Sequence, residues 1–188
     1  MKTLTLLRHA KSGWDDPAAR DFDRALNPRG KRAAAQIGQY LSDQCIAFDH
    51  VLASPAVRVV ETLDHLATTY PSLPPPEWER RIYLASAATL LDLVAGVPDS
   101  VERLLLVGHN PGLEDLVLML VPIDNDPDRD SGELRLRDEV EIKFPTASLA
   151  ELQFDCAHWA EVGNTTATLK KFVRPRDLDP SLGPDEHD

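Results

Sequence analysis

Three short apolar runs, at residues 3–7, 50–53 and 104–107, are each bounded by polar or turn-forming residues. Short continuous runs of this kind are typical of strands that are buried on both faces of a sheet. Each run is followed by a stretch in which apolar residues recur at the spacing of an amphipathic helix. The pattern therefore predicts parallel strands that are joined by helices.

The expected helices also have recognisable start signals. A residue that caps helices well stands before proline in Asn27-Pro28, Ser54-Pro55 and Asn110-Pro111, and proline is favoured at the first helical position. A fourth helix is expected to begin at Ser86 and to end at Gly96. The predicted order of these elements is β-α-β-α-α-β-α.

The C-terminal part of the chain shows a different pattern. Residues 140–144, 148–154 and 166–173 alternate or are rich in strand-forming residues, which predicts extra strands, some of them antiparallel. No internal repeat is visible, so we expect residues 1–174 to form one three-layer α/β/α sandwich with a mostly parallel central sheet. Residues 175–188 are acidic and contain prolines, and we expect them to form a flexible tail.

The composition and charge of the chain disfavour some classes of partner and indicate the cellular compartment. The 188 residues include 20 Lys and Arg against 31 Asp and Glu, a net charge of −11, which disfavours nucleic acid and anionic membranes as partners. Any anion site must therefore be local. No apolar run approaches the roughly 18 residues of a membrane helix, and Arg8, His9 and Lys11 interrupt any signal-peptide core. Cys45 and Cys156 have no CxxC spacing, and we expect both to be buried thiols of a cytoplasmic protein.

Two imidazoles and two guanidiniums follow the ends of the predicted strands. Arg8 and His9 come after the first strand, Arg58 shortly after the second, and His109 after the third. Ligands of parallel sheets bind at the carboxyl ends of the strands, where helix N-termini offer unpaired N–H groups. With Ser54 as the cap, Arg58 is the fourth helical residue, where a cation opposes the helix dipole and a nearby anion removes that conflict. We therefore expect the four side chains to surround an anion.

These residue types suit phosphoryl transfer. Arginine binds phosphate oxygens with a planar and permanently charged fork. A neutral imidazole can attack phosphorus through one ring nitrogen while the other donates a hydrogen bond, which gives a phosphohistidine that water later cleaves. This chemistry needs no metal ion, and we predict neither a metal nor another cofactor.

Four segments of the chain resemble the consecutive motifs of the histidine phosphatase superfamily, which also contains the phosphoglycerate mutases: LTLLRHAKS, LNPRGKRAA, VLASPAVRVVETL and LLLVGHNPGLEDL. FPTASLAELQFD and LKKFVRPRDL resemble the SixA-like phosphohistidine phosphatases in particular, so the resemblance covers nearly the whole chain. It implies a phosphoglycerate mutase-like fold. It also implies a phosphatase that acts on phosphohistidine in a histidine phosphotransfer or carrier protein.

The resemblance assigns roles to individual residues. It implies that His9 is the nucleophile, in a motif where Ala10 stands in place of the usual glycine. It also implies that Arg8, Arg58 and His109 hold the phosphoryl group during transfer.

A further arginine, Arg24 in DFDRALNPRG, matches the SixA-like motif and is a candidate substrate-binding residue. The alternative for Arg24 is a surface ion pair with Asp21 or Asp23. Lys11 and Ser12 are close enough in sequence to touch the anion, but neither is assigned a catalytic role.

The general acid is harder to place. Larger relatives use a glutamate in an ER-containing motif, and Glu79 in the segment ERRIY resembles it loosely, with an ordinary surface glutamate as the alternative. Protonation of an alcohol leaving group contributes about 10²- to 10⁴-fold to the rate. An imidazole leaving group is far less basic, so a missing acid would favour phosphohistidine substrates.

Three classes of function stay open from the sequence: a protein phosphohistidine phosphatase, a small-molecule phosphomonoesterase and a non-catalytic phosphate-binding regulator. A cysteine phosphatase is excluded because Val51 and Val162 stand where its motif needs arginine, and the chain contains neither a P-loop nor a dinucleotide fingerprint. The acidic run at residues 124–132 has its glycine one place late for a calcium loop, and Arg137 occupies the position of the bidentate glutamate.

Overall fold

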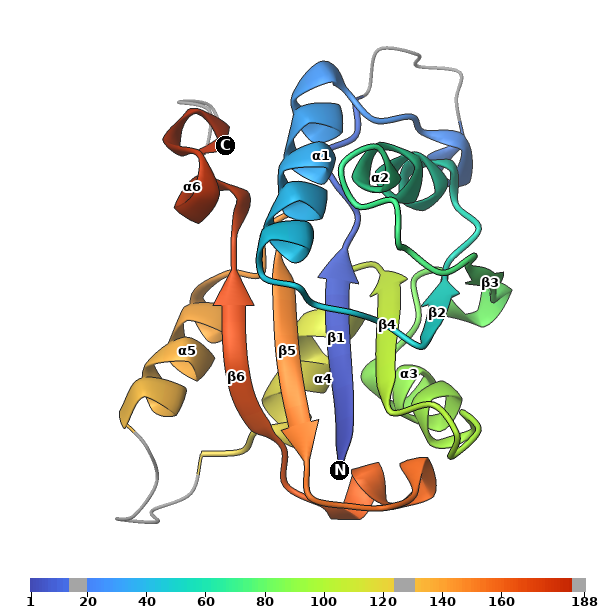
Figure 1. Cartoon of the computed structure of the whole chain (residues 1–188), viewed down its shortest axis with the longest axis vertical. Coiled ribbons are helices and arrows are strands. Elements are labelled where there is room, and N and C mark those ends of the chain that lie inside the picture. Colours follow the sequence, from blue (N-terminus) through green and yellow to red (C-terminus); the bar gives the residue numbers. More distant parts are fainter. Residues whose placement is uncertain (14–19, 124–130, 184–188) are drawn as a thin grey trace.

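The computed structural model describes residues 1–13, 20–123 and 131–183, and within these ranges one sheet of six strands forms the centre of the molecule (Figure 1). The order across the sheet is β3-β2-β4-β1-β5-β6. The strands are β1 (Lys2–Arg8), β2 (His50–Ala53), β3 (Glu77–Trp78), β4 (Arg103–Gly108), β5 (Leu149–Phe154) and β6 (Thr168–Val173). Neighbours from β3 to β1 are parallel, whereas β5 and β6 are each antiparallel to the preceding neighbour. The mostly parallel α/β sheet predicted from the sequence is therefore confirmed.

Helices cover both faces of the sheet and give the three predicted layers (Figure 1). The helices are α1 (Pro28–Asp43), α2 (Val57–Ala67), α3 (Ala87–Ala95), α4 (Gly112–Leu120), α5 (Ser131–Ile142) and α6 (Pro175–Leu178). Residues of α1 and α2 share one apolar core with one face of the sheet, and residues of α3, α4 and α5 share another core with the opposite face.

The alternation of side chains along the central strand explains why both cores exist. Leu4 and Leu6 of β1 point into the core shared with α3 and α4, and Leu7 points into the core shared with α1 and α2. All three are fully buried, and burial of one such side chain contributes about 1.5–3 kcal/mol. A strand that is apolar on both faces is thereby held in the middle of the molecule.

Two of the predicted helix starts are confirmed and two are wrong. Asn27 and Ser86 cap α1 and α3, each accepting a hydrogen bond from a backbone N–H of the first turn. In contrast, α2 begins at Val57 after Ala56, and α4 begins at Gly112, so neither Ser54 nor Asn110 is a cap. Their side chains bond elsewhere, as described below.

The strand predicted at residues 140–144 is also wrong, because residues 140–142 belong to α5 and residues 143–144 follow it. Val140 and Phe144 are fully buried while Ile142 between them is 83% exposed. Leu136 packs against the same core, so the buried positions repeat every four residues. A four-residue repeat and a two-residue alternation look alike over so short a segment.

The packed chain continues past the predicted domain end at residue 174. Pro175 and Leu182 are buried, and Leu182 belongs to the core of α1 and α2. Arg29 of α1 donates from Nη2 to the Leu182 carbonyl over 2.9 Å. The expectation of a flexible tail from residue 175 is therefore corrected for residues 175–183, and residues 184–188 lie outside the described part.

Three smaller expectations can be compared with the described residues. Cys45 is exposed and Cys156 is half-buried, so the prediction that both are buried thiols is wrong. Most of the acidic run at 124–132 lies outside the described ranges. No helix in the described part of the chain is long and apolar enough to cross a membrane.

Candidate active site

The structure brings together the four side chains predicted to surround an anion. Arg8 ends β1 and His9 follows it, Arg58 lies in the first turn of α2, and His109 follows β4. Because β2, β4 and β1 are parallel neighbours, the loops after them meet at one edge of the sheet. Arg58 Nε lies 3.3 Å from His9 Nε2, and Arg58 Nη2 lies 3.2 Å from His109 Nδ1.

Arg58 is the buried centre of this group, with only 2% of its surface exposed. Since α2 begins at Val57, Arg58 is the second helical residue and not the fourth as predicted. A buried guanidinium is costly unless its donors are paired. Here its branches reach the rings of His9 and His109 and the carboxylate of Asp21.

The hydrogen bonds of His9 fix its tautomer. Nδ1 lies 2.8 Å from the carbonyl oxygen of Ala10, which only accepts, so Nδ1 carries the proton. Nε2 is therefore the unprotonated nitrogen, and it faces the Arg58 donor. Burial, reinforced by the neighbouring His109, Arg58 and Arg8, lowers the pKa of His9 to about 3. The ring is consequently neutral at physiological pH with a lone pair on Nε2.

His109 is held in the opposite tautomer. The Arg58 guanidinium only donates, so His109 Nδ1 accepts from it and Nε2 carries the proton. Nε2 lies 2.8 Å from Ser54 Oγ, the hydroxyl that sequence analysis treated only as a helix cap. Burial, followed by the charge of Arg58, lowers the pKa of His109 to about 3. Two neutral imidazoles thus flank one guanidinium.

The Arg8 side chain lines the same cavity and is anchored to the segment that follows α5. Its Nη1 donates to the carbonyl of Phe144 over 2.7 Å, while its Nε is buried and has no hydrogen-bond partner among the described residues. Asn110 Nδ2 donates to the same carbonyl over 3.1 Å, which ties the loop after β4 to Phe144. Burial lowers the pKa of Arg8, but arginine stays charged at neutral pH.

Asp21, which sequence analysis considered only as a surface partner, links three side chains at the site. Its carboxylate accepts from Arg24 Nε over 3.1 Å, from Arg58 Nη2 over 3.1 Å and from the Tyr83 hydroxyl over 2.6 Å. The Tyr83 hydrogen bond is the main cause of a lowered pKa at Asp21, and the Arg58 charge adds to it. Arg24 therefore forms the ion pair given as its alternative, and it also lines the cavity described next.

A cavity of about 300 Å³ opens over these groups. Its polar lining comprises the predicted Arg8, His9, Arg24, Arg58 and His109, together with Lys11, Ser12, Asp21, Asn110 and Thr146. Four cationic side chains and two imidazoles on one small cavity can bind a phosphoryl group. The unprotonated nitrogen of His9 can act as a nucleophile. The described residues contain no group of three His, Cys, Asp or Glu side chains arranged to hold a metal ion.

Glu79, the candidate general acid, is not among the residues that line this cavity. Its carboxylate pairs with Arg81 Nη2 at 2.8 Å and accepts from the Arg81 backbone N–H at 2.9 Å. These bonds lower the pKa of Glu79, so the side chain is ionised at neutral pH. The arrangement does not support its predicted role as a proton donor.

Comparisons with known proteins agree with the motifs. The model of the histidine phosphatase superfamily (branch 1) matches residues 4–81. The uncharacterized protein Rv1276c of Mycobacterium tuberculosis is 35% identical over 170 residues, which cover 90% of this chain and 100% of the relative.

Solved structures show the same relationship. A protein of Nakamurella multipartitia described as a candidate phosphohistidine phosphatase SixA is 32% identical, with a TM-score of 0.78 over 93% of this chain and 96% of that one. A protein of Agrobacterium tumefaciens with the same description is 29% identical, with a TM-score of 0.74 over 93% of this chain and 99% of that one. The family match, the length of the shared sequence and the shared fold lead to one conclusion: this chain belongs to the histidine phosphatase superfamily, is SixA-like, and is a phosphatase.

Proposed function

We propose that this phosphatase removes phosphoryl groups from phosphohistidine residues of a protein, without a metal ion, through a covalent intermediate on His9. The observation that carries the proposal is the neutral His9 ring, whose unprotonated Nε2 lies 3.3 Å from Arg58 Nε in a cationic cavity. The similar proteins described as SixA support the choice of substrate class.

In the first step, His9 Nε2 attacks phosphorus and a new N–P bond forms while the P–N bond of the substrate breaks. The leaving imidazole keeps the bonding electron pair and takes up a proton from solvent water. In the second step, water attacks phosphorus, the N–P bond to His9 breaks, and inorganic phosphate leaves. The Nδ1 bond to Ala10 keeps the ring oriented through both steps.

Arg8, Arg58 and His109 are proposed to hold the phosphoryl group as its charge redistributes. Arginine forks match the equatorial oxygens of a phosphoryl group in transfer. The guanidinium of Arg58 is fixed before substrate arrives because His9, His109 and Asp21 already hold its branches. A donor that needs no reorganisation is worth most in the transition state.

Among the described residues, no protonated carboxyl group lines the cavity, which favours a substrate with a good leaving group. Glu79 is ion-paired outside the cavity, and Asp21, the carboxylate that lines the cavity among described residues, has a lowered pKa. Neither carboxyl is protonated at neutral pH. An alkyl phosphate, whose leaving group needs a proton most, is consequently expected to be a poor substrate.

A substrate panel tests this proposal. We expect kcat/KM for a phosphohistidine protein to exceed that for any sugar phosphate by at least about 10³-fold, about 4 kcal/mol of transition-state stabilisation. Turnover is expected to persist in excess EDTA. Comparable kcat/KM values for a sugar phosphate and the phosphoprotein would contradict the proposed substrate and support a small-molecule phosphomonoesterase, and no turnover of any substrate would support a phosphate-binding regulator.

A further inference from the structure

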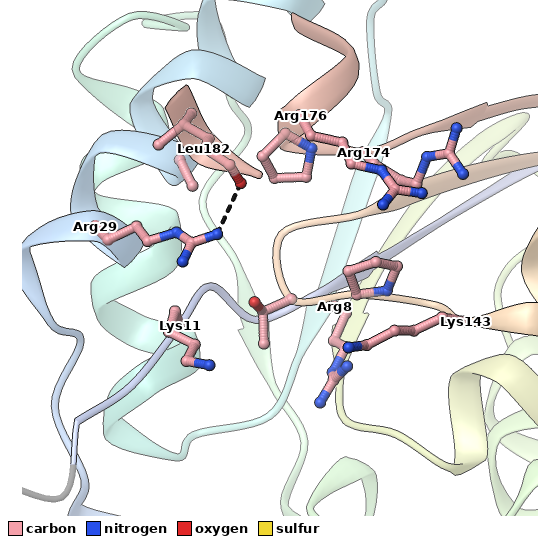
Figure 2. Close-up of a pocket in the computed structure, with 11 residues that line it drawn as sticks. Arg8, Lys11, Arg29, Lys143, Arg174, Arg176 and Leu182 are labelled. Atoms are coloured by element: carbon pink, nitrogen blue, oxygen red, sulfur yellow. Dashed lines mark hydrogen bonds between the residues drawn. The ribbon is translucent and has the colours of Figure 1, made fainter. Parts of the chain in front are cut away.

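A second cavity, of about 250 Å³, adjoins the candidate active site. Arg8, Lys11 and Thr146 line both cavities, so the two lie side by side at the end of β1. We call the second one the basic cavity. Figure 2 shows cationic side chains around it that come from separate parts of the chain.

The charges of the basic cavity come from four segments. Besides Arg8 and Lys11, it is lined by Arg29 of α1, Lys143 after α5 and Arg176 of α6. Lys143 and Arg176 are exposed. No acidic side chain in the described part of the chain lines the cavity.

Arg174 also lines the basic cavity, but its contacts differ from those of Lys143 and Arg176. It pairs with Glu139 at 3.0 Å and with Asp177 at 2.9 Å, so its charge is balanced within the protein. Among the described residues, Lys143 and Arg176 form no ion pair with a carboxylate. The chain carries a net charge of −11, so this local excess of cations runs against the overall charge and favours an anionic ligand.

Arg8 lines both cavities, and among the described residues its guanidinium forms one hydrogen bond, from Nη1 to the Phe144 carbonyl. Its charge is therefore available to an anion at the point where the two cavities adjoin. The apolar residues Ala33, Pro145, Pro175 and Leu182 line the rest of the cavity.

We propose that the basic cavity binds a second anionic group that belongs to the same substrate molecule as the phosphoryl group to be removed. The proposal rests on the proposed function, because it treats the neighbouring cavity as the site of phosphoryl transfer. The anion can be an acidic side chain of a phosphohistidine protein or another phosphoryl group. Both would be recognised by the same ammonium and guanidinium donors, and the experiment below distinguishes them.

The test compares the double variant Lys143→Gln/Arg176→Gln with the matched control Lys31→Gln/Arg32→Gln. The control removes two exposed cations of α1 that line neither cavity, so both double variants change the net charge equally. Hydrolysis of p-nitrophenyl phosphate needs only the first cavity and is expected to stay within about twofold of the parent in both. Thermal unfolding checks that the variants are folded.

In the first arm, inorganic phosphate and tripolyphosphate compete with p-nitrophenyl phosphate. We expect the inhibition constant of tripolyphosphate to rise about tenfold in the cavity variant, the loss of about 1.4 kcal/mol, and that of phosphate to stay unchanged. In the second arm, KM for a phosphohistidine protein is expected to rise about tenfold at constant kcat. The control variant should change neither quantity.

The two arms separate the possible results. Losses in both arms support the cavity and show that it accepts either anion. A loss confined to tripolyphosphate supports the cavity and assigns a second phosphoryl group, and a loss confined to the phosphoprotein supports it and assigns an acidic side chain. Unchanged constants in both arms, or equal losses in the control variant, overturn the inference. If the parent enzyme does not hydrolyse phosphohistidine protein, the proposed function is contradicted. The tripolyphosphate arm still tests whether the basic cavity binds an anion.

Discussion

The two adjoining cavities hold their cations in opposite ways. Arg58 is 2% exposed and its guanidinium is tied to two histidines and Asp21, whereas Lys143 and Arg176 of the basic cavity are exposed. A buried and fixed cation stabilises a transition state without reorganisation. An exposed cation is screened by water and contributes less, mainly to encounter and orientation. The contrast therefore separates a site for chemistry from a site for recognition.

Removal of the His9 imidazole should abolish catalysis in the first cavity without changing the residues of the basic cavity. We expect His9→Ala to lower kcat by at least about 10³-fold, because the two-step route loses its nucleophile. Rapid quenching of the parent enzyme with labelled substrate should trap a phosphoenzyme that is labile in acid and stable in alkali. His65→Ala, which changes a histidine of α2 outside the cavity, is the control, and turnover of His9→Ala within tenfold of the parent would refute the assignment.

The convergence of Arg8, His9, Arg58 and His109 was predictable because parallel strands place their carboxyl ends at one edge. The partners that orient them were not. Asp21 bonds Arg58 across 37 positions and Tyr83 bonds Asp21 across 62. No local pattern records a contact over such a separation, since it depends on how the 3₁₀ helix η1 (Asp21–Asp23) packs near α2.

The basic cavity and α5 were also not predictable from the sequence pattern. Lys11, Lys143 and Arg176 belong to three distant segments that meet only when residues 175–183 pack onto α1. Because residues 175–188 were expected to be flexible, no contact between them and α1 was predicted. Residues 140–144 could not be assigned from alternation alone because Val140 and Phe144 satisfy both a helical and an extended repeat.

Arg58→Ala sharpens the contrast between fixed and exposed cations. We expect it to lower kcat by about 10²-fold or more and to weaken vanadate binding in parallel. Arg58→Lys should recover only part of the loss, because an ammonium cannot reach His9, His109 and Asp21 with a planar fork. Arg32→Ala, an exposed arginine of α1, is the control. Unchanged kcat and vanadate affinity in Arg58→Ala would show that Arg58 does not bind the phosphoryl group.

Burial of the two imidazoles should also make the free energy of unfolding depend on pH. The pKa of His9 and of His109 is about 3 in the folded chain and 6.5 ordinarily, so the unfolded chain binds more protons between these values. The contribution of each neutral imidazole to the free energy of unfolding is therefore fully present well above pH 6.5 and decreases as the pH falls. We expect the free energy of unfolding to decrease by about 1.5 kcal/mol per histidine between pH 6.5 and pH 5. Urea unfolding should show a smaller acid loss in His9→Asn, and an unchanged loss would contradict the burial argument.

The smallest effect is expected at Glu79, which lies outside both cavities. Its carboxylate is already ionised by the Arg81 contact, and the leaving groups of phosphohistidine and p-nitrophenyl phosphate need little protonation. Glu79→Gln should therefore change kcat/KM for both substrates by less than about twofold, with Glu77→Gln on β3 as the matched control. A sugar phosphate is the discriminating substrate. If the parent enzyme hydrolyses a sugar phosphate efficiently and only Glu79→Gln abolishes that hydrolysis, then Glu79 moves into the cavity and acts as an acid. Glu79 would then belong with the residues of the first cavity that take part in catalysis.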